Sequence, residues 1–251
     1  MRSPLSYVGG KNRFVSIILP LIPEHTTYVE PFAGGAQIFF HKPASKVEVL
    51  NDLDGELVNF YRICQSHHEE LIRYMRFMLL SREWFSRLHK TPPEALTDIQ
   101  RAARYFYLQK SAYGGRVARQ NYAIHVVQRP NFSPARLHEL IETAHERLSR
   151  VQIECLPYED VVARYDRAAT FFYLDPPYYD IRLYRHNLEH DDFVRMAEHL
   201  KGIKGKFLLS INDRPEVRQI FSAFSIVPIT VSYSLHRRAG KHNTELLIKN
   251  Y

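Results

Sequence analysis

Short runs of β-branched and aromatic residues recur along the chain, and the spacing of apolar positions predicts strands towards both of its ends. Thr26 to Glu30 is one such run. Thr170 to Leu174 is a continuous apolar run, which is typical of a central parallel strand covered on both faces. The other expected strands are residues 46–52, 151–156, 206–211, 226–233 and 246–248. The last two flank a basic loop and are expected to pair as a hairpin.

Between these groups of strands the apolar positions follow a helical period. From Gly55 to about Pro134 the chain consists of long segments rich in arginine and aromatic residues, with apolar positions three and four residues apart. The first apolar stripe is made of Leu57, Phe60, Tyr61 and Cys64. Ser133-Pro134 is a typical helix start. Shorter helices are expected over residues 36–40 and 191–200.

The order of these elements predicts an α/β fold. We expect a Rossmann-like sheet domain built from residues 1–53 plus 151–251, with a mainly helical insertion, residues 54–150, between its two halves.

The composition is that of an ordinary globular protein with an excess of positive charge. Hydrophobic residues make up 45% of the 251 residues, enough for a core without disulfide or metal staples. Cys64 and Cys155 are far apart in the sequence, so reduced structural thiols are expected. The apolar stretch 15–22 is broken by Pro20 and is too short to span a bilayer, so we expect a soluble cytoplasmic protein. The net charge of +7 favours a polyanionic partner.

A glycine turn follows the first expected strand. It contains Gly34 and Gly35, and Asp52 ends the second strand 18 residues after Gly34. A strand, a glycine turn and a helix, with an acid after the next strand, form the layout that binds a nucleoside, with the acid accepting from the ribose hydroxyls. The glycines fall short of G-x-G-x-x-G, which argues against a dinucleotide. From this motif alone, a plain β-turn-α corner is an equal alternative.

The tetrapeptide Asp175-Pro176-Pro177-Tyr178 directly follows the most apolar strand, where open α/β sheets bind ligands. Its prolines remove two backbone donors and leave carbonyl oxygens and the Asp175 carboxylate as acceptors. Such a slot suits a target amino group, which has protons to donate, and Tyr178 offers a flat face for a base. An Asp-Pro-Pro turn that merely ends a strand is the alternative, and its place after this strand argues against it.

Taken in order over nearly the whole chain, these motifs resemble the Dam-like DNA adenine methyltransferases of the alpha group. The matching elements are Ser6 to Lys11, Glu30 to Gly35, Asn51-Asp52 and Asp175 to Tyr178. The resemblance implies a Rossmann-like S-adenosylmethionine-dependent methyltransferase sheet, in which the insertion recognises the target. One departure is Ala36, which stands where the family has its second glycine.

The resemblance also implies the roles of individual residues. Contacts with the cofactor are implied for Tyr7, Lys11, Phe32, Gly34, Asp52, Tyr158 and Asp175. Catalytic roles are implied for Asp175, Pro176 and Tyr178. Asp175 and the Pro176 carbonyl accept the amino protons of an adenine flipped out of double-stranded DNA, and Tyr178 stacks on the base. A cytoplasmic enzyme encoded by a bacterium or a phage is expected, and the sequence leaves open whether it is a monomer or a weak dimer.

Two basic stretches are candidates for contact with DNA. The first lies in the insertion, where the family has its recognition region, and includes Lys110, Arg116 and Arg119. The second, in the loop between the last two strands, includes Arg237, Arg238 and Lys241. A solvated charged surface is the simpler alternative, but the fold context favours DNA.

Other functions match only parts of the sequence. Gly10-Lys11 ends like a phosphate-binding loop, but Asn12 stands where Ser or Thr is required. His186 and His190 have the H-x-x-x-H spacing of a zinc site, but the glutamate of zinc proteases is replaced by Asn187, so no metal is expected. A methyltransferase of the same fold acting on RNA, cytosine or protein, and a non-catalytic DNA-binding module, are the alternatives to an adenine methyltransferase.

Overall fold

A computed structural model describes residues 1–5, 7, 11–115, 117–118, 120–124, 132–231 and 243–251. Its strands are β1 (Thr27–Glu30), β2 (Val47–Asn51), β3 (Gln152–Glu154), β4 (Thr170–Leu174), β5 (Lys206–Asn212), β6 (Ser225–Val231) and β7 (Asn243–Lys249). Its α-helices are α1 (Val15–Ile18), α2 (Gln37–His41), α3 (Gly55–Ser66), α4 (His68–Met75), α5 (Arg82–Lys90), α6 (Asp98–Ser111), α7 (Leu137–Leu148), α8 (Tyr158–Tyr165), α9 (His190–Lys201) and α10 (Pro215–Ile220).

The strands form one seven-stranded sheet in the order β3-β2-β1-β4-β5-β7-β6. β1 pairs in parallel with β2 on one side and with β4 on the other, so the direction of the strand order reverses between β1 and β4. β7 runs antiparallel between β5 and β6, which confirms the expected terminal hairpin. β4 is buried at every position, as its continuous apolar run predicts. This is the Rossmann-like α/β architecture expected from the sequence.

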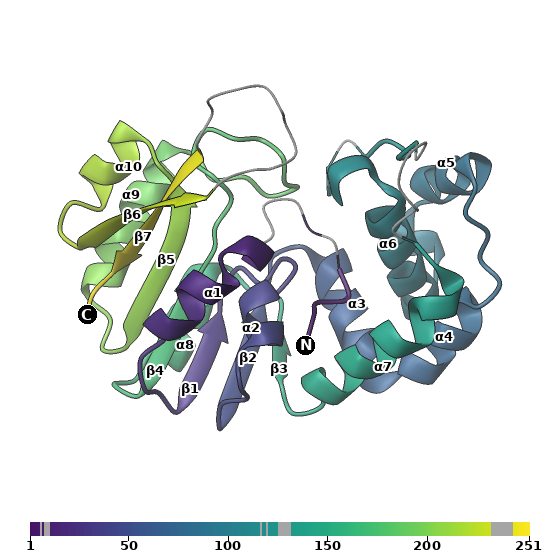
Figure 1. The fold of residues 1–251 in the computed structure, drawn as a ribbon, viewed down its shortest axis with the longest axis horizontal. Coiled ribbons are helices and arrows are strands. Elements are labelled where there is room, and N and C mark those ends of the chain that lie inside the picture. Colours follow the sequence, from purple (N-terminus) through teal and green to yellow (C-terminus); the bar gives the residue numbers. More distant parts are fainter. Residues whose placement is uncertain (6, 8–10, 116, 119, 125–131, 232–242) are drawn as a thin grey trace.

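Helices α3 to α7 gather beside the sheet, at the right of Figure 1. Their ends carry the signals expected of real helix boundaries: the Asp54 carboxylate accepts from the N–H of Glu56 at the start of α3, and Thr97 with Gln100 forms a capping box at the start of α6. Strands β1 and β2 precede these helices in the chain, and strands β3 to β7 follow them.

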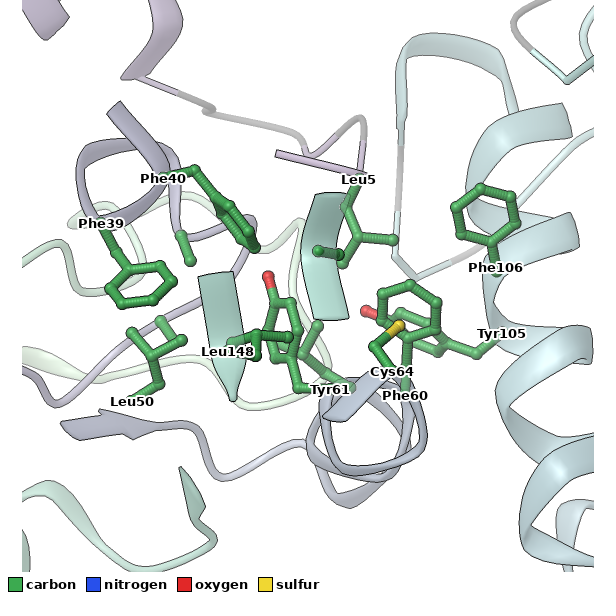
Figure 2. Packing of buried hydrophobic residues seen from close by; sticks show 14 of the residues in the cluster. Leu5, Phe39, Phe40, Leu50, Phe60, Tyr61, Cys64, Tyr105, Phe106 and Leu148 are labelled. Atoms are coloured by element: carbon green, nitrogen blue, oxygen red, sulfur yellow. The ribbon is translucent and has the colours of Figure 1, made fainter. Parts of the chain in front are cut away.

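A continuous hydrophobic core joins these helices to the sheet. Figure 2 shows Leu50 of β2 and Phe39 of α2 on one side, with Phe60 and Phe106 of the helices on the other. The Phe60 and Phe106 rings stack with their centroids 5.5 Å apart. Side chains from the helices and from the sheet therefore pack in one core. This packing fixes the position of α3 relative to the carboxyl ends of β1 and β2.

Candidate active site

A pocket opens at the carboxyl ends of β1 and β4, where the strand order reverses. Open α/β sheets bind ligands at this point because the loops on the two sides diverge from it. The polar and aromatic residues that line the pocket include Tyr7, Lys11, Glu30, Phe32, Asp52, Tyr158, Asp175, Tyr184 and Arg185. The structure thus brings together all seven residues that the resemblance assigns to the cofactor, although they come from segments far apart in the sequence.

The glycine turn after β1 forms the floor of the pocket. Gly34 has a φ of 46°, in the left-handed region that glycine adopts without strain. A side chain at Gly35 would bring its Cβ within 2.8 Å of the Tyr7 Cβ, so Tyr7 packs directly on the bare backbone. Ala36 has a φ of 47°, and this left-handed conformation explains why a glycine is usual at its position. Ala36 adopts this conformation although it carries a methyl group.

Asp52 follows β2 and is held in place by the backbone. Its two carboxylate oxygens accept hydrogen bonds from the N–H groups of Gly34 and Asp54, each at 2.9 Å. Burial raises the pKa of Asp52 from 3.8 to about 6, and these two hydrogen bonds oppose the rise. The carboxylate is therefore a fixed acceptor that links the glycine turn to the start of α3.

Asp175 stands at the end of β4, with its carboxylate beside Lys11. The distance from Lys11 Nζ to Asp175 Oδ1 is 2.7 Å, and Ser210 Oγ donates to the same oxygen at 3.2 Å. Burial raises the pKa of Asp175, and the Lys11 ammonium opposes the rise. Both contacts use Oδ1, so within the described residues Oδ2 is left for a ligand. Pro176 is buried behind it, and Pro177 lines the pocket.

Lys11 is only 2% exposed, and its charge is held by three groups. Burial alone lowers its pKa, but Asp175, Tyr178 and Glu245 outweigh burial, and the net pKa is raised. Lys11 Nζ donates to the Tyr178 hydroxyl at 2.9 Å and lies 4.6 Å from the centroid of the Tyr178 ring. The Tyr178 hydroxyl in turn donates to Glu245.

Two aromatic residues expected near the cofactor lie together in the pocket. Phe32 follows β1, Tyr158 begins α8, and their ring centroids are 5.2 Å apart. The expected base-stacking residue, Tyr178, is not among the residues that line the pocket, because its ring lies against Lys11. Its predicted contact with a flipped base stays a prediction.

Of the residues expected to contact DNA, the structure describes Lys110, and this residue is buried. Lys110 is 8% exposed in α6, its Nζ lies 5.5 Å from the Phe106 ring centroid, and burial lowers its pKa to about 8. A buried ammonium of this kind is not presented to a phosphate group, so Lys110 does not belong to the surface cations. The other expected contacts, Arg116, Arg119, Arg237, Arg238 and Lys241, lie outside the described residues.

Sequence reasoning missed several residues of the site. Ser210 of β5 and Glu245 of β7 contact Asp175 or its partners. Ser210 is a polar residue within the apolar run of β5, which is a signal that could have found it, whereas Glu245 follows two polar residues at the start of β7 and carries no such signal. Tyr184 and Arg185 enter the pocket from the loop after β4, and the guanidinium of Arg185 donates to Asp54 Oδ1 at 3.1 Å. Glu30, in the matched motif, also lines the pocket. Burial raises its pKa to about 8.

Two further features bear on the class of protein. Among the residues that the structure describes, no group of three or more His, Cys, Asp or Glu side chains is arranged to hold a metal ion. The same described residues contain no helix that is long and apolar enough to cross a membrane.

The strand order, the glycine turn and the acceptor-lined pocket define a doubly wound α/β protein with a nucleoside-type binding site. Residues 7–235 match the family model described as D12 class N6 adenine-specific DNA methyltransferase, and the chain belongs to this family. It is therefore an adenine-specific DNA methyltransferase, and the family implies S-adenosylmethionine as methyl donor and DNA as substrate. Family membership decides for adenine in DNA against the alternative targets and against a non-catalytic module.

Curated relatives agree with the family model over the whole chain. The type II methyltransferase M.CviBI of Paramecium bursaria Chlorella virus NC1A is 25% identical, and the match covers 100% of both chains. The type II methyltransferase M1.LlaDCHI of Lactococcus lactis subsp. cremoris is 26% identical over 100% of this chain and 96% of the relative. A DNA N-6-adenine-methyltransferase of Escherichia phage P1 is 23% identical over 91% of this chain and 32% of the relative.

Proposed function

We propose that the protein methylates adenine at specific sites in double-stranded DNA, with the target base flipped into the pocket and its amino group held by Asp175. The observation that carries this proposal is the shared pocket: Asp175 opens into the same cavity as the glycine turn and Asp52. A nucleoside-binding half and an acceptor for an amino group are thus side by side, as transfer between two bound molecules requires.

The residues of the pocket fit S-adenosylmethionine. The backbone at Gly34 and Gly35 offers a surface without side chains, Asp52 supplies an acceptor for ribose hydroxyls, and the pair formed by Phe32 and Tyr158 offers apolar surface for an adenine ring. When bound, this cofactor supplies an electrophilic methyl group on a sulfonium. Tyr7, packed on the glycine turn, and Lys11 would close the pocket around it.

The hydrogen-bond acceptors at the end of β4 select an amino group as the group that is methylated. The free oxygen of Asp175 and the Pro176 carbonyl would accept the two amino protons of adenine, which turns the nitrogen lone pair away from the ring. Flipping the base costs a few kcal/mol, and these hydrogen bonds offset part of it. The acceleration would come from positioning and from fixed dipoles in a site without water.

The relatives suggest where such an enzyme works. Two of them are named type II methyltransferases, so we propose that this protein protects DNA as part of a restriction–modification system. The proposed site of action is the cytoplasm of a bacterium or of a phage-infected cell. Arg116, Arg119, Arg237, Arg238 and Lys241 remain the proposed contacts with the DNA backbone.

Replacing Asp175 with Ala tests this function. Removing the acceptor should lower methyl transfer by at least about 10²-fold, in the range expected when a catalytic acceptor is lost. The measurement is formation of N6-methyladenine in unmethylated genomic DNA, with sequencing to map the modified positions. Asp180→Ala is the control, because Asp180 is an exposed acid five residues further along the same loop.

Cofactor binding and thermal unfolding should be measured on the same Asp175→Ala protein. Retained binding with lost transfer supports the proposed role. Methyl transfer within a few-fold of wild type would contradict it.

A further inference from the structure

We propose that Glu245 is a positioning residue for methyl transfer, which acts on Asp175 through Lys11 and Tyr178. This inference rests on the proposed role of Asp175 as acceptor for the target amino group. It adds a residue from the opposite half of the sheet, which no sequence motif singled out.

Glu245 reaches the site because β7 is inserted beside β5. In the register of the sheet it lies opposite Asn212 of β5 and Ile229 of β6, and it is 2% exposed. One carboxylate oxygen accepts from the Tyr178 hydroxyl, and the other lies 3.6 Å from Lys11 Nζ. That second oxygen has no hydrogen-bond partner within the described chain, so its main interaction is with the charge of Lys11.

Two carboxylates, one buried and one partly exposed, therefore share one buried ammonium. Lys11 Nζ is 2.7 Å from Asp175 Oδ1 and 3.6 Å from Glu245 Oε2, and the Tyr178 hydroxyl bridges Lys11 to Glu245. Charges this close interact strongly when they are buried. The attraction between Glu245 and the Lys11 ammonium weakens the neutralisation of Asp175 by Lys11. The hydrogen bonds that pass through the Tyr178 hydroxyl fix the orientation of the ammonium.

Because Lys11 interacts with both carboxylates, Asp175 is a stronger hydrogen-bond acceptor than it would be in an ion pair with Lys11 alone. If Lys11 paired with Asp175 alone, the carboxylate would be better neutralised, its pKa would fall, and its hydrogen bond to an amino proton would weaken. The second carboxylate prevents this, and the three groups together keep a net negative charge beside the pocket that would hold the cofactor. The described titratable groups that act on Asp175 or on its immediate partners are Lys11, Glu30, Tyr173, Tyr178, Tyr184 and Glu245.

The test is Glu245→Gln, which keeps the shape and an acceptor for Tyr178 but removes the charge. We expect kcat to fall about tenfold while KM for S-adenosylmethionine changes much less, as for loss of an interaction made mainly in the transition state. We also expect the acidic limb of the pH–rate profile to move to lower pH by on the order of one pH unit, because Asp175 now ionises more easily. Impaired folding would lower the rate without moving this limb downwards.

Glu48→Gln is the matched control. Glu48 is also a buried strand carboxylate paired with a lysine, at 2.6 Å from Lys42 Nζ, but it does not line the pocket. The Glu48→Gln substitution should reduce the melting temperature and leave the acidic limb of the pH–rate profile at the wild-type pH. A Glu245→Gln protein with wild-type kcat and an unmoved limb would overturn the inference.

Tyr178→Phe is a second variant, in case Glu245→Gln does not fold. It removes the bridge from Lys11 to Glu245 and keeps the ring, so a smaller loss of kcat with a shift of the limb in the same direction is expected. An unshifted limb would count against the inference. If the wild-type protein itself transferred no methyl group to DNA, the proposed function would fail, which is a different outcome from an active wild type with an unaffected Glu245→Gln.

Discussion

Replacing Asp52 with Asn tests whether the half-buried carboxylate that follows β2 is a hydrogen-bond acceptor with a raised pKa. The carboxylate accepts from the backbone N–H groups of Gly34 and Asp54, each at 2.9 Å. Asparagine keeps one acceptor oxygen but turns its NH₂ group towards the other N–H, which then has no acceptor. We expect this to lower the free energy of unfolding by about 1–3 kcal/mol.

The size of this loss should depend on pH, because burial raises the pKa of Asp52 from 3.8 to about 6. An acid with a higher pKa in the folded state keeps its proton longer there, so its contribution to stability falls as the pH rises between these two values and is constant above them. For these pKa values the wild-type protein loses about 1.4 kcal/mol between pH 5 and pH 7.5 through this group. The substituted amide cannot titrate, so the destabilisation by Asp52→Asn should be smaller at pH 7.5 than at pH 5 by that amount.

Urea unfolding of both proteins at the two pH values measures this difference. Asp213→Asn is the control: hydrogen bonds from Arg218 hold the pKa of Asp213 below 3.8, so this group is ionised at both pH values and its replacement should cost the same free energy at pH 5 and at pH 7.5. Calorimetry on the Asp52→Asn protein should also show binding of S-adenosylmethionine weakened about tenfold or more, since a charged acceptor is lost. Equal destabilisation at pH 5 and pH 7.5 would refute the raised pKa.

Two further predictions concern the floor of the pocket and the expected DNA contacts. Gly35→Ala should cost about 1–3 kcal/mol and weaken cofactor binding, because the new Cβ would lie 2.8 Å from the Tyr7 Cβ. Thermal unfolding measures the cost against Gly55→Ala, where nothing lies within 4 Å of the new Cβ, and equal stability of the two variants would contradict the close packing. Replacing Arg237 and Arg238 with Ala should weaken binding to all DNA sequences alike and reduce the slope of log affinity against log salt by about 1 for each lost phosphate contact. Fluorescence anisotropy at several salt concentrations measures the slope, and an unchanged slope would place the phosphate contacts elsewhere.

The elements of the fold could be predicted where burial is simple. β4 is covered on both faces, so every position is buried and the four residues after Thr170 form an apolar run that is easy to recognise. The stripe of Leu57, Phe60, Tyr61 and Cys64 is buried in α3, as the helical period requires. The boundaries of the strands were predicted less exactly. β7 begins at Asn243 and not at Leu246. Its first residues are polar, so the apolar pattern does not include them, but they still pair with β6.

The site could be predicted only in its local parts. The glycine turn and the tetrapeptide at Asp175 are contiguous, so their chemistry is visible in the sequence. Glu245 lies 70 residues from Asp175, and only the insertion of β7 beside β5 brings it to Lys11. The burial of Lys110 could not be predicted for a related reason: a basic stretch does not reveal which face of α6 points inward, and the Lys110 ammonium lies over the Phe106 ring.

The position of β7 also sets the order in which the enzyme becomes competent as it is synthesised. β7 follows β6 in the chain but lies between β5 and β6 in the sheet, so β6 has no neighbour in the sheet until β7 has left the ribosome. A nascent chain that ends at β6 already carries the glycine turn, Asp52 and Asp175, but its Lys11 faces a single carboxylate. The placement of Lys11 between two carboxylates is therefore completed only when β7 joins the sheet, although every residue that lines the pocket precedes that strand in the chain.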